Sequence, residues 1–325
     1  MGNFLESEKI RQVAFKKTST SLSEAARLDG EFRGAERPFC LPQELSLETL
    51  YPPIRNDAIS FYKKHGIMWH QGINDKPSNH LCDSMTCCAN FLFPFSDQAE
   101  ALKALLKPFF PDIERMLPVE DDRFVSFEWI GAQNYLGERM GKNGERSRGA
   151  NFTSTDAIVA YQRVDGSMQI VLIEWKYTES YSSASLQIAK SGTDRSLIYR
   201  HLFEKEDCVI NKDALPSYSD IFFEPFYQFF RQQSLAHEME KAGELNADNV
   251  CLLHIAPENN YDFRRVTSPG LRQTGSTATE VWKSLLREPD RFISLGTKQL
   301  FADFDYESMR AWKAYILERY SGIFA

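Results

Sequence analysis

The chain has 325 residues, of which 42% are hydrophobic and 26% charged, and its formal net charge is −7. This composition is typical of a soluble globular protein and supplies enough chain for one large domain or two modest ones. The negative balance argues against a protein that coats nucleic acid non-specifically, because Lys and Arg make the phosphate contacts. No apolar run reaches the length of a membrane span and residues 1–12 carry no apolar export signal, so we expect a cytoplasmic protein.

The N-terminal part, residues 1–95, is expected to form an arm and a helical extension that packs on a core made by residues 96–325. Its first fifty residues are polar and mixed, and short helices are expected at 44–50 and 56–65. The sequence does not favour a zinc site at His80, Cys82, Cys87 and Cys88, because the second pair of ligands typical of zinc sites is missing. Apolar residues recur at helical spacing there, which predicts a core helix with free, buried thiols.

A helix is predicted from Ser96 to Leu117, interrupted by prolines, and a strand from Arg123 to Ile130. Glu128 stands in that strand among aromatic and aliphatic residues. A carboxylate is costly to bury there unless it is paired or bound to a metal. A short helix is expected over 132–139.

A glycine-rich, basic loop follows. Its cations are Arg139, Lys142, Arg146 and Arg148, with Glu145 the only acid among them. A local basic patch on an acidic body can bind nucleic acid, so these residues are candidates for a clamp on backbone phosphates. A solvated loop is the alternative interpretation.

Residues 156–177 are predicted to form a β-hairpin. Apolar runs flank an Asp-Gly pair at 165–166, which is a strong hairpin signal. An antiparallel hairpin brings the start of its first strand beside the end of its second, so Asp156 should lie near Glu174 and Lys176. Side chains alternate across a strand, so Glu174 and Lys176 share a face while Trp175 points the other way.

Two carboxylates and an ammonium on one sheet face indicate a Mg²⁺ site. Hard cations take carboxylate oxygens and fill their remaining positions with water and substrate phosphate. A lysine beside the ion can orient or activate the attacking water. The alternative is an ion-paired strand end on a solvated face.

The spacing of Asp156, seventeen residues and then Glu174-Trp175-Lys176 resembles the PD-(D/E)xK nuclease superfamily, whose fold is restriction-endonuclease-like. Thr155 stands where many members have a proline. The motif core covers about 25 residues of this sequence, and the order of elements extends the likeness to roughly residues 95–260. The resemblance implies an α/β fold with a mixed central sheet flanked by helices, and Mg²⁺-dependent hydrolysis of phosphodiester bonds.

The same resemblance implies further site residues. An additional upstream acid completes the metal site, for which Glu128 is the first candidate and Glu138 the second. The backbone carbonyl of Trp175 is a further metal ligand. A helix after the Glu-x-Lys strand can add Gln187 or Lys190 to the site.

Residues 222–245 are predicted to form a helix with an aromatic core face. Gln228 and Arg231 are interleaved with the aromatic residues and can reach the active face of the sheet. Residues 249–256 are predicted to form a buried strand that extends the sheet, with His254 a core histidine. Helices are expected at 279–287 and 308–320. No glycine-rich nucleotide loop of the GxxxxGK[ST] or strand-linked GxGxxG type is present.

Together these patterns predict a nuclease that acts on nucleic acid, DNA in the first place, with Mg²⁺ as cofactor and Mn²⁺ as a substitute. The site is expected to consist of Asp156, Glu174, Lys176 and Glu128. Two alternatives stay open: a catalytically silent module that binds a partner or nucleic acid, and hydrolysis of another phosphoester such as a nucleotide. Cleavage of a duplex would favour a homodimer.

Overall fold

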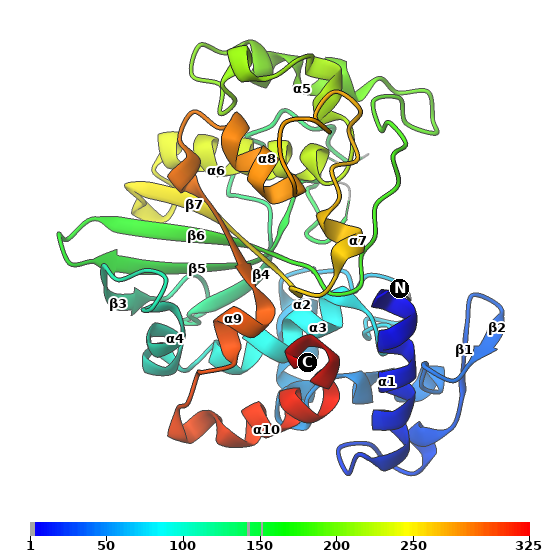
Figure 1. The fold of residues 1–325 in the computed structure, drawn as a ribbon. Coiled ribbons are helices and arrows are strands. Elements are labelled where there is room, and N and C mark those ends of the chain that lie inside the picture. The colour runs from blue at the N-terminus through cyan, green and yellow to red at the C-terminus, as the bar shows by residue number, and fades with distance from the viewer. Residues whose placement is uncertain (1–3, 142–143, 151) are drawn as a thin grey trace.

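The computed structural model describes residues 4–141, 144–150 and 152–325 (Figure 1). These residues contain a six-stranded mixed sheet and a separate two-stranded hairpin. The hairpin strands are β1 (Gly30–Phe32) and β2 (Ala35–Arg37). The sheet strands are β3 (Ile113–Leu117), β4 (Val125–Trp129), β5 (Thr155–Arg163), β6 (Met168–Trp175), β7 (Asn249–Ala256) and β8 (Phe292–Gly296).

The sheet is built on the antiparallel pair β5 and β6, and its order is β3-β5-β6-β7-β8. Strands β3 and β4 both pair antiparallel with β5, where β4 takes its first half and β3 its second. Strands β7 and β8 continue the sheet in parallel with β6. The predicted Asp-Gly turn joins β5 to β6, and Gly166 adopts φ +88°, which a residue without a Cβ adopts readily. The predicted mixed sheet is thus confirmed.

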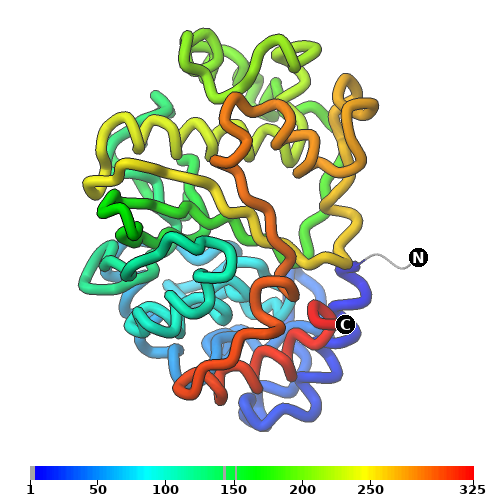
Figure 2. Tube along the Cα trace, turned by 60° about the vertical axis from the view of Figure 1, so that its left-hand side comes forward, coloured from blue at the N-terminus to red at the C-terminus, as the bar shows by residue number. Residues whose placement is uncertain are grey.

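Helices cover both faces of the sheet. Figures 1 and 2 show α5, α6 and α8 on one side and α1 to α4 with α10 on the other. None of the helices in the described ranges is long and apolar enough to cross a membrane. The helices are α1 (Phe4–Thr18), α2 (Arg55–Lys64), α3 (Ser84–Leu92), α4 (Ala99–Leu106), α5 (Arg195–Glu204), α6 (Phe226–Ala242), α7 (Tyr261–Arg264), α8 (Ala278–Leu285), α9 (Thr297–Phe301), α10 (Arg310–Arg319) and α11 (Ser321–Phe324).

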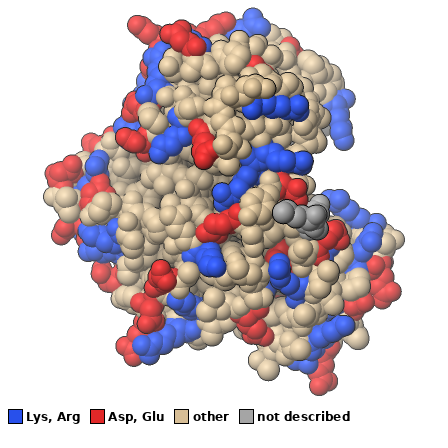
Figure 3. All heavy atoms as spheres, in the orientation of Figure 1, with Lys and Arg blue, Asp and Glu red and all other residues tan. Residues whose placement is uncertain are grey.

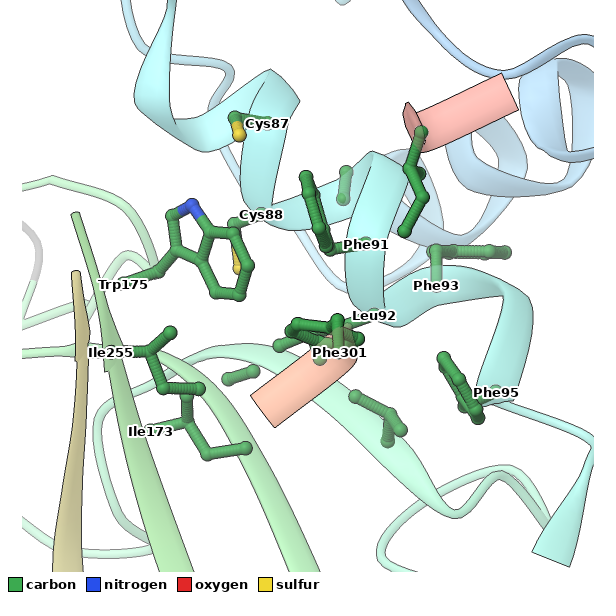
Figure 4. Close-up of a cluster of buried hydrophobic side chains, with 14 of the residues drawn as sticks. Cys87, Cys88, Phe91, Leu92, Phe93, Phe95, Ile173, Trp175, Ile255 and Phe301 are labelled. Atoms are coloured by element: carbon green, nitrogen blue, oxygen red, sulfur yellow. The ribbon is translucent and has the colours of Figure 1, made fainter. Parts of the chain in front are cut away.

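The central strands are apolar on both faces because each face meets its own core. In β6, Val171, Ile173 and Trp175 belong to one core, and Ile170 and Leu172 belong to the other. Figure 4 shows the first core where α3 packs on the sheet. There the Trp175 indole lies 4.8 Å from the Phe91 ring between centroids. The alternation of side chains along β6 therefore places the Trp175 side chain in the first core.

The N-terminal extension is joined to the rest of the chain by this first core, which includes side chains from Phe4 to Ile323. Helix α1 also reaches the end of β6 through a polar contact. The hydroxyl of Tyr177, the residue after Lys176, donates a hydrogen bond of 2.7 Å to the buried Glu8. The expected division at residue 95 stays a prediction.

Several predicted elements differ from the structure. Residues 113–117, expected at the end of a helix, form strand β3, because this stretch pairs with the free edge of β5. The helices expected over 132–139 and 184–190 do not form, and both stretches are turns and irregular chain. The helix expected from residue 222 begins at Phe226, after Pro225.

Candidate active site

A cavity of about 520 Å³ lies at the edge of the sheet where β5 begins and β6 ends. Three carboxylates and one ammonium that the sequence singled out line it together, from Glu128, Asp156, Glu174 and Lys176, and Asp83 and Glu179 add two further carboxylates. Side chains from the N-terminal extension form much of the remaining wall. The structure therefore brings together four of the residues that the sequence singled out.

The β5–β6 ladder explains why Asp156 and Glu174 meet. Ala157 pairs with Ile173 in antiparallel register, so the residues just beyond that pair are neighbours. The Asp156 carboxylate accepts a hydrogen bond of 2.6 Å from the backbone N–H of Trp175. This contact fixes the start of β5 against the end of β6.

Glu174 is the most buried of the three carboxylates, with 1% of its surface exposed, and each of its oxygens is hydrogen-bonded. Its Oε1 is ion-paired with Lys176 and accepts a hydrogen bond of 2.8 Å from Gln228. Its Oε2 accepts a hydrogen bond from Gln232. Gln228 and Gln232 are one turn apart on α6, so they reach the same side of the helix. Helix α6 thus holds the Glu174 carboxylate in one orientation.

Glu128 is the penultimate residue of β4, and its side chain lines the cavity. It has φ +49°, an uncommon value for a residue with a side chain. Its Oε2 accepts a hydrogen bond of 2.7 Å from the Ser154 hydroxyl. The guanidinium of Arg148 hydrogen-bonds the carbonyls of Phe127 and Glu128, which holds this backbone in place.

The charges in the cavity are unbalanced, because five carboxylates of the described residues line it against the ammonium of Lys176 and the guanidinium of Arg33. Burial and the nearby Glu174 raise the pKa of Asp156 well above its usual range. Burial also raises the pKa of Glu128 to about 7; the Ser154 hydrogen bond opposes this shift and Glu174 adds to it. Burial disfavours the charge on Lys176, but attraction by Glu174 together with Tyr181, Glu179 and Asp156 raises the pKa of that ammonium. A cation bound among the carboxylates would relieve the excess negative charge.

The donor set fits a hard divalent cation. Within the described residues, no group of three or more His, Cys, Asp or Glu side chains is already placed to hold a metal ion. Mg²⁺ does not need one, since it is bound through one or two carboxylates and keeps several waters. Asp156, Glu174 and Glu128 offer carboxylate oxygens around a space large enough for those waters.

Comparison with known families supplies the identity of this chain. The family described as Restriction Endonuclease associating with ARP, REase-ARP, matches residues 9–321. The chain belongs to the REase-ARP family. No curated protein and no solved structure matches it. The family match includes the N-terminal extension, whose side chains line the cavity, as well as the sheet.

Arg146 and Arg148 of the basic loop do not line the cavity of this REase-ARP chain. Arg148 binds Glu120 and backbone carbonyls, and Arg146 donates a hydrogen bond of 2.5 Å to the carbonyl of Ile130. Both arginines line a different cavity, together with Trp129 at the end of β4. Arg139 is exposed, and Lys142 lies outside the described residues. A phosphate clamp at the carboxylates is therefore not formed by Arg146 or Arg148.

Two other predicted residues take structural roles. Gln187 lies in irregular chain and its amide contacts Ser196 at 3.4 Å, away from the carboxylates. The helix expected to carry it does not form, and α6 supplies the glutamines instead. Glu138 accepts hydrogen bonds from Thr153 and from Tyr199, at 2.7 Å for the latter, and does not line the cavity. Of the two upstream acids, Glu128 is the one at the cavity.

Some residues at the site were not predicted from the sequence. Gln232, which donates to Glu174 without lining the cavity, was missed, although its spacing of four from Gln228 was a usable signal. The N-terminal contribution, which includes Arg33, His70 and Gln71, carried no signal. These residues come from turns far along the chain from the motif, and only the tertiary fold brings them to the site.

Proposed function

We propose that this REase-ARP chain is a metal-dependent nuclease that hydrolyses phosphodiester bonds in nucleic acid, DNA in the first place. The observation that supports it is the convergence of Asp156, Glu174 and Lys176 on one cavity, in a family described as restriction endonucleases. Glu128 adds a third carboxylate at the same place. The name of the family also leads us to propose that the chain associates with an ARP partner.

In this proposal Mg²⁺ or Mn²⁺ is held by Asp156, Glu174 and Glu128, with the carbonyl of Trp175 as a further ligand. The ion supplies charge neutralisation at the phosphoryl group and lowers the pKa of a bound water. Gln228 and Gln232 fix the Glu174 carboxylate so that its free lone pairs keep their direction. The ordered carboxylate reduces the reorganisation needed when the substrate binds.

Lys176 acts as a donor in this scheme. Attraction by Glu174 keeps the pKa of its side chain high, so it is an ammonium and carries no lone pair to accept a proton. Its N–H groups can orient the attacking water or stabilise charge on a phosphate oxygen. The ion pair with Glu174 fixes its position beside the metal ligands.

Replacement of Asp156 by asparagine tests the proposal. The amide oxygen can still accept the hydrogen bond from the Trp175 N–H, while the negative charge is lost. We expect Asp156→Asn to fold normally and to lose cleavage of plasmid DNA in Mg²⁺. Asp165→Asn is the matched control, because Asp165 lies exposed in the turn at the other end of the same hairpin. Full cleavage by Asp156→Asn would refute the assignment.

The second candidate is a catalytically silent, nuclease-like module that works by binding a partner or nucleic acid. Two observations favour it: the net charge of −7, and the engagement of both Glu174 oxygens by protein donors. Divalent cation binding separates the two candidates, because a silent module has no need of the ion. Hydrolysis of a nucleotide is distinguished by salt, since only a long chain of phosphates gives a steep dependence of binding on salt concentration.

A further inference from the structure

Part of the cavity lining comes from the N-terminal extension. Phe32 and Arg33 belong to the β1–β2 hairpin, and His70 and Gln71 to the turn after α2. These four side chains are cationic or neutral, whereas Asp83 of the same extension adds a carboxylate. A phosphate bound in this cavity would have both a metal at the carboxylates and donors such as Arg33 within the same lining.

The turn of the hairpin places Arg33 at this wall. Arg33 has φ +53° and Gly34 φ +74°, and Phe32 pairs with Ala35 around them. Positive φ at both central residues is the pattern of a type I′ turn, which matches the twist of a two-residue hairpin. Figure 1 shows the hairpin standing out from the body of the molecule near the N-terminal helix.

Arg33 is a cation with no acidic partner. Its guanidinium lies 5.2 Å from the centre of the Phe32 ring, and it makes no salt bridge within the described ranges. Over the face drawn in Figure 3, Lys and Arg are interspersed with Asp and Glu. Affinity for a polyanion must therefore come from local groups such as Arg33.

A second cavity, of about 500 Å³, continues from the first. Phe32, Arg33 and Gln71 line both, so the two share a boundary at the hairpin. The second cavity adds Glu31, Gln43 and Ile73, of which Ile73 is an apolar side chain that is 52% exposed. The two cavities together form a groove, here called the hairpin groove, that runs from the carboxylates past the hairpin.

We propose that an unpaired strand of nucleic acid leaves the carboxylates along the hairpin groove, with a phosphate on Arg33 and bases against Phe32 and Ile73. This assignment rests on the proposed nuclease function. Proteins that bind single strands combine a cation for the backbone with aromatic or apolar surfaces for the base faces. A duplex hides its base faces and is held through several cations, whereas the hairpin groove offers the apolar side chains Phe32 and Ile73 beside Arg33, with Glu31 as an acid in its lining.

The test measures binding of labelled single strands, blunt duplexes and tailed duplexes of one sequence, as DNA and as RNA. The Asp156→Asn background prevents cleavage. Arg33→Ala should weaken binding of the single strand and the tailed duplex, and should reduce the salt slope by about 0.7, the value for one phosphate contact on a single strand. Ile73→Ser should weaken binding of the same two probes. The blunt duplex should bind more weakly than the single strand.

Two matched controls come from the same chain. Arg37→Ala removes an exposed arginine at the end of β2, on the same hairpin but outside both cavities. Val164→Ser removes an exposed apolar side chain at the distant β5–β6 turn. Both should bind the probes like the parent.

The outcomes separate this inference from the function on which it rests. Equal affinities for Arg33→Ala and Arg37→Ala, or tighter binding of the blunt duplex than of the single strand, overturn the strand path while cleavage by the parent chain stands. A parent chain that neither binds nor cleaves any of the probes overturns both proposals. Dependence on Arg33 and Ile73, with the controls unchanged, supports the strand path.

Discussion

Gln228 donates a hydrogen bond of 2.8 Å to the Glu174 carboxylate, and this joins helix α6 to the end of the β6 strand. Gln232, one turn later, donates to the other oxygen of the same carboxylate. Helix α6 therefore holds both oxygens of a candidate metal ligand. This relationship leads to the first prediction.

Gln232→Ala should weaken binding of Mn²⁺ by about ten- to a hundredfold, the usual cost of removing a partner that orients a metal ligand. Isothermal titration with Mn²⁺ measures it. Gln233→Ala is the control, because the amide of this adjacent buried glutamine donates to the carbonyl of Arg291, whereas that of Gln232 donates to Glu174. If both variants bind Mn²⁺ like the parent, Gln232 does not position Glu174 for a metal.

Because Lys176 is ion-paired with the buried Glu174, we expect the stability of the fold to depend on both charges. Lys176→Met leaves a carboxylate buried without its cation, and removal of one partner of such a pair costs about 3 to 5 kcal/mol of unfolding free energy. Urea denaturation without metal measures this loss. The double variant with Glu174→Gln should recover most of it, since neither charge is then left. If the double variant is as unstable as Lys176→Met, the loss of stability comes from the packing of the methionine and not from an unpaired charge.

The metal-free protein should lose stability as the pH rises from about 4.5 to about 7. The pKa of Glu128 is about 7 in the fold and near its usual value when unfolded, so the folded state binds the proton more tightly. Unfolding free energy therefore falls as the pH rises through this window, by about 3 kcal/mol for a shift of this size. Asp156 acts in the same direction.

Glu128→Gln isolates this effect. The amide does not titrate, so the curve of unfolding free energy against pH should be flatter between pH 4.5 and 7 than in the parent. Urea denaturation at a series of pH values gives both curves. Parallel curves would mean that Glu128 does not titrate differently in the fold.

Divalent cations should stabilise the parent protein, because an ion that binds the folded state shifts unfolding by mass action. At a hundred times the dissociation constant the gain is about 2.7 kcal/mol. Thermal unfolding with and without Mg²⁺ or Mn²⁺ measures it, with Asp165→Asn expected to keep the gain and Asp156→Asn to lose it. An unchanged melting temperature for the parent would favour the silent module.

Arg148 and Arg139 should behave differently although both lie in the basic loop. Arg148 hydrogen-bonds Ser126, the carbonyl of Phe127 and Glu120, so Arg148→Ala should lower the unfolding free energy by about 2 to 3 kcal/mol. Arg139 is exposed, and Arg139→Ala should leave stability unchanged. Urea denaturation of both compares them; equal stability would show that the Arg148 contacts contribute little.

The hairpin that carries the motif was predictable because its signals are local. Alternation of apolar residues sets the faces of β5 and β6, and the Asp-Gly turn sets their pairing. Together these place Asp156, Glu174 and Lys176 at one end of the hairpin before any other element is known. The strand at 249–256 was predictable for a similar reason, since a strand covered on both faces is apolar along its length.

Elements without a strong local pattern were decided by their partners. Residues 113–117 became a strand because the edge of β5 needs a hydrogen-bonding neighbour, and that need does not appear in their own sequence. Likewise, Arg148 reads as a surface cation in the sequence, and only the fold shows that it binds the backbone of β4.

The amino-acid sequence by itself determined the carboxylate hairpin and the resemblance that it carries, because adjacent strands need only local pairing. Tertiary structure decided what surrounds the carboxylates: the glutamines of α6 on Glu174, and Arg33, His70 and Gln71 in the lining of the same cavity. Those contacts join segments far apart in the chain. They form because a shared apolar core packs the N-terminal extension and α6 against the two faces of one sheet, and no local pattern encodes that packing.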